Sequence, residues 1–307
     1  MSNLRLLIIN KTDTSGLLDD PNQPRHLDVP NQLKHLSWDS YPLKCLSSIS
    51  QPMELVHLEL RLSRLEYLWE GVMLSSKLKI IDLSSSFDLI RTPDFSGVPI
   101  LEKLDLSYCA GLVEIHPSIG QLSKLRYLHL EFRTSLTDLP SMSAEMQSLT
   151  VLNLEECSRI SSFPKFTGIM KSLSELKFGG TAIKKIPPSS IECLTALTLL
   201  SLRYCEDLEC LPSNILNLKS PEKLDLYYCS KLKSLPRLPS TVRVIDARQC
   251  DSLKWSLAQL KLSKCSQPFS QWYQLDERYI PVEFKILFHL LQVISLSLSL
   301  SLLNNNN

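Results

Sequence analysis

The pattern Leu-x-x-Leu-x-Leu recurs along this chain at a nearly constant spacing, and no other feature constrains the fold as strongly. Its first positions are Leu4, Leu33, Leu55, Leu78, Leu101, Leu125, Leu149, Leu173 and Leu197, with degenerate forms at Pro221 and Val242. These eleven units are 21 to 29 residues apart, and 24 is the most frequent spacing. Self-similarity at such a period indicates a stack of identical supersecondary units rather than an ordinary globular core.

Each unit predicts one short strand. In the stretch that begins Leu101-Glu-Lys-Leu-Asp-Leu, the apolar residues at positions 4 and 6 alternate with polar ones, which is the period of a half-buried strand. Strands repeated at this spacing are typical of leucine-rich repeats. We therefore predict an α/β solenoid, a leucine-rich repeat horseshoe with a parallel β-sheet on its concave side. The solenoid should span residues 1–255, and residues 256–307 should form an irregular C-terminal tail with Ser-Leu and Asn low complexity.

Prolines near the end of most units predict what lies opposite the sheet. They are Pro93, Pro117, Pro140, Pro164, Pro187, Pro212 and Pro236. Proline fixes φ and has no N–H to donate, so it suits extended segments outside a sheet. The convex side should therefore be mostly irregular or 3-10 in conformation, with about one helical turn in residues 118–124 and 189–195.

The two ends of the chain carry separate expectations. The first strand begins three residues after Met1 and has no cap, which favours a domain that normally precedes it. In the tail, the Ser-Leu alternation is what a translated dinucleotide repeat would give, so read-through of non-coding sequence is one hypothesis. The stretch 284–303 is long enough to span a membrane, but its lysine, histidine, glutamine and serines disfavour that interpretation.

Composition and cysteine usage exclude few functions, but they indicate the cell compartment in which the protein is expected. The formal net charge is +1 and the hydrophobic fraction is 44%, which fits a soluble protein and gives no electrostatic argument for nucleic acid or an acidic membrane. The N-terminal apolar run is too short for a signal peptide. Nine cysteines are present without any CxxC pair. We expect a reducing, cytoplasmic or nucleo-cytoplasmic location.

Five of the cysteines share position 9 of the repeat, and a periodic slot indicates packing. They are Cys109, Cys157, Cys205, Cys229 and Cys250. A small, mostly apolar side chain with a weak donor suits the tight turn after a strand. A metal or redox cluster is the alternative, because the last three fall in consecutive units. The lack of paired spacing favours the structural role.

Motifs for catalysis are missing from the sequence. No phosphate-binding loop, dinucleotide fingerprint or nucleophile elbow occurs. His35 and His57 share position 3 of neighbouring units, with Asp39 and Glu59 nearby, but this set suits a solvated surface better than a metal site. An open concave sheet also offers no closed pocket for acid–base chemistry. We expect no enzymatic activity, no cofactor and no metal.

Aromatic and charged residues on the concave side are the candidate binding site. Positions 2, 3, 5, 7 and 8 should project from that face. The candidate protein-binding residues are Tyr108, Tyr127, Phe132, Arg203, Tyr204, Tyr227, Tyr228 and Arg248. Exposed aromatics on a rigid surface are frequent binding hot spots. The alternative is that these rings merely cover strand edges. Gly179 and Gly180 should leave a bare spot in the middle of the row.

Several phrases go beyond a generic repeat. They include Val29-Pro-Asn-Gln-Leu-Lys-His-Leu-Ser-Trp-Asp-Ser-Tyr-Pro-Leu43, Leu65-Glu-Tyr-Leu-Trp-Glu-Gly71, Ile90-Arg-Thr-Pro-Asp-Phe-Ser-Gly97, Val113-Glu-Ile-His-Pro-Ser-Ile-Gly120 and Leu238-Pro-Ser-Thr-Val-Arg-Val-Ile-Asp-Ala247. With these stretches, residues 1–255 resemble the leucine-rich repeat domain of plant intracellular TIR–nucleotide-binding–leucine-rich-repeat (TIR-NBS-LRR) disease resistance proteins.

The resemblance implies a role in innate immunity and defence signal transduction. Such repeats are sensors that contact a pathogen effector or a guarded host protein and restrain the nucleotide-binding switch domain, which this chain lacks. The jelly-roll-like domain that often follows the repeats is only faintly echoed in residues 274–277. Two other readings stay open: an extracellular or secreted leucine-rich repeat receptor or inhibitor, and a non-functional truncated receptor fragment. The sequence names no ligand and no oligomeric state.

Overall fold

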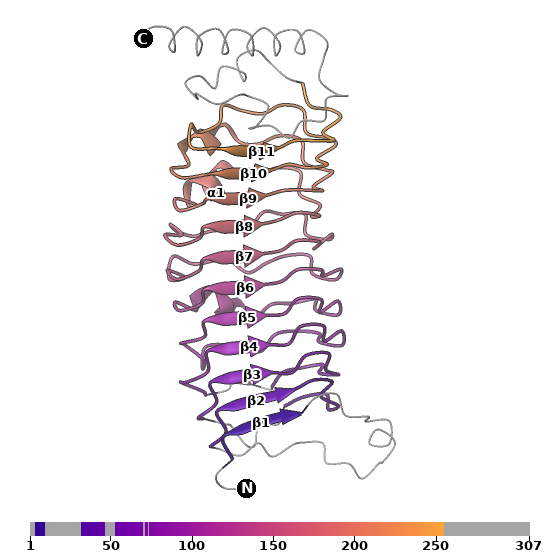
Figure 1. Ribbon diagram of the computed structural model, residues 1–307, viewed down its shortest axis with the longest axis vertical. Coiled ribbons are helices and arrows are strands. Elements are labelled where there is room, and N and C mark those ends of the chain that lie inside the picture. Colours follow the sequence, from indigo (N-terminus) through magenta and orange to yellow (C-terminus); the bar gives the residue numbers. More distant parts are fainter. Residues whose placement is uncertain (1–3, 10–31, 47–52, 70, 73, 255–307) are drawn as a thin grey trace, which may run out of the picture.

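The structure is a computed structural model that describes residues 4–9, 32–46, 53–69, 71–72 and 74–254. Within them, eleven strands form one sheet in chain order. The strands are β1 (Leu6–Ile9), β2 (His35–Trp38), β3 (His57–Glu59), β4 (Ile80–Asp82), β5 (Lys103–Asp105), β6 (Tyr127–His129), β7 (Val151–Asn153), β8 (Glu175–Lys177), β9 (Leu199–Ser201), β10 (Lys223–Asp225) and β11 (Val244–Asp246). They stack into an elongated solenoid (Figure 1).

Every neighbouring pair of strands is parallel and in register, so equivalent repeat positions lie side by side. Leu104 of β5 pairs with Leu128 of β6, and Leu128 pairs with Leu152 of β7. Each strand begins at position 3 of its repeat, and position 4 is the central buried residue. The predicted fold class, a leucine-rich repeat solenoid with a parallel sheet, is confirmed. The predicted boundary at residue 255 stays a prediction, because residues 255–307 lie outside the described part of the chain.

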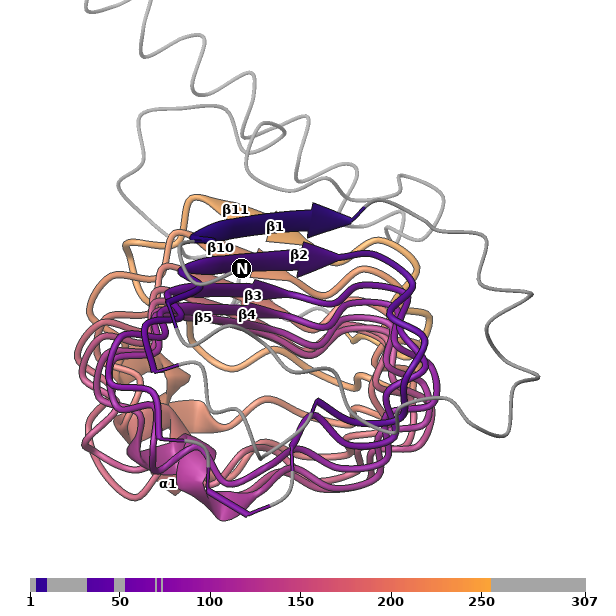
Figure 2. The same ribbon diagram turned by 90° about the horizontal axis from the view of Figure 1, so that it is seen from below.

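Short helical turns lie across from the sheet. They are the 3-10 helices η1 (Pro117–Gln121) and η2 (Ser213–Asn217) and the single-turn helix α1 (Pro188–Glu192). Viewed along the solenoid, the sheet forms one side and the helical turns lie on the opposite, convex side (Figure 2). Pro117 and Pro188 stand at the first turn of their helices, where a missing N–H is harmless.

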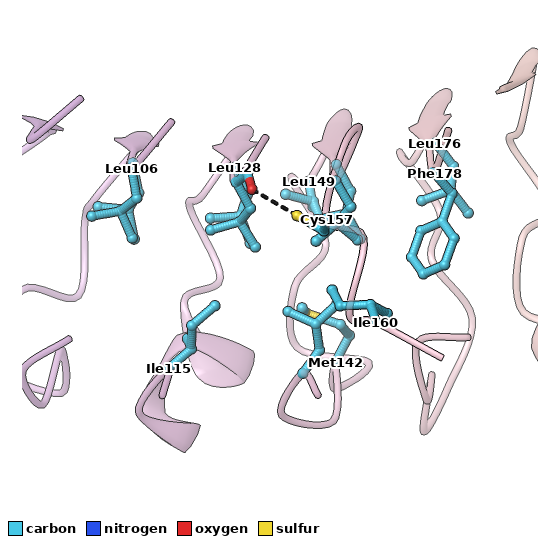
Figure 3. Packing of buried hydrophobic residues seen from close by; sticks show 14 of the residues in the cluster. Leu106, Ile115, Leu128, Met142, Leu149, Cys157, Ile160, Leu176 and Phe178 are labelled. Carbon is cyan, nitrogen blue, oxygen red and sulfur yellow. Dashed lines mark hydrogen bonds between the residues drawn. The ribbon is translucent and has the colours of Figure 1, made fainter. Parts of the chain in front are cut away.

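The leucines of successive units form one continuous core. Leu101, Leu104 and Leu106, at positions 1, 4 and 6 of one repeat, are fully buried. Figure 3 shows equivalent residues of the following repeats packing behind the sheet in the same way. A strand of three residues cannot bury such a side chain alone, so each unit depends on its neighbours for stability. This rigid frame fixes where the concave side chains lie.

Candidate protein-binding surface on the concave side

An aspartate or asparagine at position 5 closes many of the strands. Its Oδ1 accepts a hydrogen bond from the backbone N–H two residues later, at 3.2 Å from Ser107 to Asp105 and at 3.1 Å from Glu155 to Asn153. Asp82, Asp225 and Asp246 make the same bond. This local bond turns the chain out of the strand. The aspartates at position 5 of these strands therefore have a structural role, because each of them stabilises the turn that follows.

The turn places position 8 in the left-handed backbone region in ten repeats. Those residues are Ser40, Leu62, Ser85, Tyr108, Phe132, Glu156, Gly180, Tyr204, Tyr228 and Gln249, with φ between 55° and 69°. Bulky residues rarely adopt this conformation, which costs about 1–2 kcal/mol per residue. Gly180 adopts it without strain, but four of the ten positions carry an aromatic ring. The repeat pattern in the sequence did not predict this strained backbone conformation.

Two of those rings form a stacked pair at the middle of the solenoid. The rings of Tyr108 and Phe132 lie 4.4 Å apart between centroids and are inclined by only 6°. The side chains remain exposed, since 45% of Tyr108 and 42% of Phe132 is accessible. Two aromatic surfaces open to solvent at strained positions are unusual for residues that serve only to pack.

A second aromatic group lies nearer the C-terminal end. Tyr204 contacts Tyr227 edge-on with centroids 5.3 Å apart, and it contacts Tyr228 at 5.7 Å. The guanidinium of Arg203 lies 5.2 Å from the centre of the Tyr204 ring, and that of Arg248 lies 5.3 Å from the Tyr227 ring. The structure therefore brings five of the eight predicted binding residues into one cluster.

Tyr127 stands apart from both groups. It lies on β6 at position 3, inside the sheet, whereas the other aromatics lie in the turns at the strand ends. The guanidinium of Arg126 lies 5.6 Å from the centre of its ring. The predicted row of eight residues is thus two clusters and one separate tyrosine.

The predicted bare spot at the glycine pair is wrong. Gly179 is buried, and a Cβ there would lie 2.6 Å from Cγ of Arg203. A Cβ on Gly180 would lie 2.8 Å from the carboxylate of Glu156. Glu155 also reaches over two repeats, because its Oε1 accepts a 3.3 Å hydrogen bond from Ser201. Neighbouring side chains cover the glycines, so the two aromatic groups are separated by carboxylates.

The position-9 cysteines lie behind the sheet, and each thiol donates to the backbone of the preceding repeat. Sγ of Cys157 lies 3.0 Å from the carbonyl oxygen of Leu130, the bond drawn as a dashed line in Figure 3. Cys109, Cys205, Cys229 and Cys250 make the equivalent bond at 3.1 to 3.2 Å. Burial raises the pKa of Cys109, Cys157 and Cys205 to about 11. These thiols are protonated at neutral pH.

One repeat carries an arginine in this slot, and sequence analysis did not single it out. Arg133 is fully buried, and its Nη2 donates to the carbonyl oxygen of Leu106 at 2.7 Å. Its Nε and Nη1 have no hydrogen-bond partner. Burial lowers its pKa to about 10. The signal was available in the sequence, because Arg133 interrupts the run of small residues at position 9.

The paired histidines lie side by side on β2 and β3. The rings of His35 and His57 lie 5.7 Å apart between centroids, and Nε2 of His57 lies 2.9 Å from a carboxylate oxygen of Glu59. Across the described ranges, no group of three or more His, Cys, Asp or Glu residues has metal-binding geometry. The same residues contain no helix long and apolar enough to cross a membrane.

The fold and its repeat define a leucine-rich repeat domain. Its sequence relatives are plant disease resistance proteins of the TIR-NBS-LRR class, and the chain fits the leucine-rich repeat domain of such a protein. No protein-family model matches the chain. The fold and these relatives together support a defence-related protein-interaction module.

Three relatives illustrate the similarity. The chain is 41% identical over 131 residues to disease resistance protein RML1A of Arabidopsis thaliana, which covers 43% of the chain and 13% of that protein. It is 43% identical over 93 residues to RPV1 of Vitis rotundifolia, covering 30% and 7%. It is 36% identical over 130 residues to TMV resistance protein N of Nicotiana glutinosa, covering 42% and 11%. The matched region is a small part of each relative's length.

Solved structures show a likeness in fold alone. The leucine-rich repeat domain of the type III effector XopL has a TM-score of 0.36 and 21% identity, covering 75% of this chain and 66% of that chain. The plant peptide hormone receptor RGFR1 in complex with RGF2 has a TM-score of 0.37 and 17% identity, covering 76% and 53%.

Proposed function

We propose that this chain is a non-enzymatic recognition module of a plant immune receptor, acting in the cytoplasm. It contacts a pathogen effector, or a host protein that an effector alters, through its concave side. In a longer receptor the same domain restrains a nucleotide-binding switch domain, and ligand binding shifts that restraint. The similarity to disease resistance proteins supports this role.

The observation that carries the proposal is the placement of the position-8 aromatics, three of them exposed and Tyr204 half-buried. Tyr108, Phe132, Tyr204 and Tyr228 all occupy position 8, where the backbone favours glycine or a small polar residue. Ser40 and Ser85 occupy the same position in other repeats, so the fold itself does not require a ring there. Rings kept at strained and exposed positions favour a surface that buries them against a partner.

The test is capture of a partner by the full chain from infected and uninfected plant tissue, with mass spectrometry to identify it. A matched bait carries serine at the four aromatic position-8 sites, and circular dichroism checks that both baits fold. We expect a pathogen or host protein to bind the unaltered bait and to be lost from the variant. Purified partner should then bind the variant at least about tenfold more weakly. Equal capture by both folded baits would contradict the proposal.

A further inference from the structure

The aromatic rings of the concave side differ in whether the guanidinium group of an arginine lies close to them. Arg126, Arg203 and Arg248 place guanidinium groups 5.2 to 5.6 Å from the ring centres of Tyr127, Tyr204 and Tyr227. Neither ring of the Tyr108–Phe132 pair has such a neighbour among the residues that the structure describes. The stacked pair is therefore an aromatic surface without a cation of its own.

Carboxylates line the same turns. The backbone N–H of Tyr108 donates to the carbonyl of Glu131 at 2.9 Å, and that of Phe132 donates to the carbonyl of Glu155 at 2.8 Å. Each residue of the pair is thus joined through its backbone to a glutamate of the following repeat. Glu156 comes directly after Glu155 and occupies position 8 of its own repeat. We call these five residues the acidic aromatic ledge.

Cations close to the ledge are already engaged. Lys103 lies 3.2 Å from a carboxylate oxygen of Asp105, and Arg133 points into the core, where it is fully buried. Burial raises the pKa of Glu131, but His129, whose Nδ1 lies 3.7 Å from the carboxylate, and the backbone N–H of Glu131 together lower it by more. The net pKa is therefore lowered and the carboxylate is ionised. Within the described residues, no lysine or arginine lies within ion-pair distance of Glu155 or Glu156, although the charge of Arg203 acts on Glu155 at longer range. The ledge therefore holds three carboxylates and no lysine or arginine in ion-pair contact with them, so its charge is negative.

We infer that the acidic aromatic ledge binds an arginine-bearing, extended segment of a partner protein. A guanidinium can lie flat on the Tyr108 or Phe132 ring and reach the neighbouring carboxylates with its N–H groups, which arginine does better than lysine. The ledge crosses three repeats, or roughly 10 Å at the spacing of parallel strands, so about three extended residues span it. This inference rests on the proposed function, since it names the chemistry of the partner at that surface.

Selection of short random peptides on the purified full chain tests the inference without a known partner. A ledge variant, Tyr108→Ser with Phe132→Ser, places at both sites the residue found at Ser40 and Ser85. A charge variant carries Glu131→Gln and Glu155→Gln. Leu62→Ser, at an exposed position 8 two repeats before Tyr108 and outside the proposed binding residues, is the matched control. Circular dichroism and thermal unfolding check that each variant folds.

We expect the selected peptides to be enriched in arginine and to bind the ledge variant about tenfold more weakly than the unaltered chain. The charge variant should weaken binding similarly, added salt should weaken it further, and Leu62→Ser should leave it unchanged. Selection of acidic or uncharged peptides that still require the ring pair would overturn the arginine inference and leave concave recognition standing. If no selected peptide requires any position-8 aromatic, both the inference and the proposed function fail.

Discussion

At the scale of single residues, position 9 holds a small side chain in most repeats, cysteine in five of them, and an arginine in one. A cysteine thiol fills it, is buried, and donates to the carbonyl of the preceding repeat, as Cys109 does to Leu83 at 3.2 Å. Arg133 makes the same bond but brings a guanidinium with two unpartnered nitrogens into the core. Burying a charge without a counter-charge costs several kcal/mol. Arg133 is therefore a local weak point of the solenoid.

Replacing that arginine with cysteine, the position-9 residue of five other repeats, should stabilise the protein. Arg133→Cys keeps a donor for the carbonyl of Leu106 and removes the buried charge. We expect the free energy of unfolding to rise by about 1–2 kcal/mol, with the small cavity limiting the gain. Urea denaturation followed by circular dichroism measures it. A lower denaturation midpoint for the variant would show that the guanidinium contributes more than it costs.

At the scale of one repeat, the strand was predictable and the turn after it was not. Alternating apolar residues such as Leu104 and Leu106 specify the strand, because their period allows only one buried side. The left-handed conformation at position 8 occurs with the Asx bond, as at Tyr108, and also without it, as at Phe132, whose repeat has His129 at position 5. Nothing in the side chain of Tyr108 reveals it. The stacking of Tyr108 on Phe132 depends on that backbone conformation, so it could not be predicted from the sequence either.

The Asx bond itself makes a prediction for this unit. Oδ1 of Asp105 accepts from both the backbone N–H and the hydroxyl of Ser107. Asp105→Ala should lower the free energy of unfolding by about 1–3 kcal/mol, because the turn loses its acceptor. Asp105→Asn keeps the acceptor, as Asn153 does in its own repeat, and should stay close to the unaltered chain. If both substitutions destabilise equally in urea, the pairing of Asp105 with Lys103 matters more than the turn.

At the scale of the whole molecule, the period of the sequence determined the architecture. Eleven parallel strands in chain order follow from eleven units, since each unit can bury its leucines only against its neighbours. The division of the concave side into two aromatic groups did not follow from the period. It depends on Glu156 and Gly180 occupying two successive position-8 turns between the rings. Contacts between side chains of different repeats determine how the concave residues are grouped, whereas the pattern within each repeat determines the stack of parallel strands.

Three of the buried position-9 cysteines act together on the stability of the whole solenoid at alkaline pH. The pKa values of Cys109, Cys157 and Cys205 are raised by burial from 9.0 to about 11. Between these values the unfolded chain releases protons that the folded chain retains, so stability should be full below pH 9 and fall as pH rises toward 11. Arg133, with its pKa lowered to about 10, opposes this trend, but one guanidinium is outnumbered by three thiols.

A series of denaturation curves across this pH range measures the effect. Cys157→Ser keeps a hydroxyl for the carbonyl of Leu130 but removes one titrating thiol. The loss of stability above pH 9 should therefore be shallower in the variant than in the unaltered chain. Identical slopes would mean that Cys157 ionises equally in the folded and unfolded chains.

The most direct test of the central claim is to ask which side of the solenoid touches a partner in plant tissue. A photo-cross-linking phenylalanine derivative is placed at Phe132 on the concave side, or at Leu216 in η2 on the convex side, a residue that is 44% exposed. We predict a covalent adduct with a pathogen or host protein from position 132 and none from position 216. An adduct from position 216 alone would contradict recognition through the concave side.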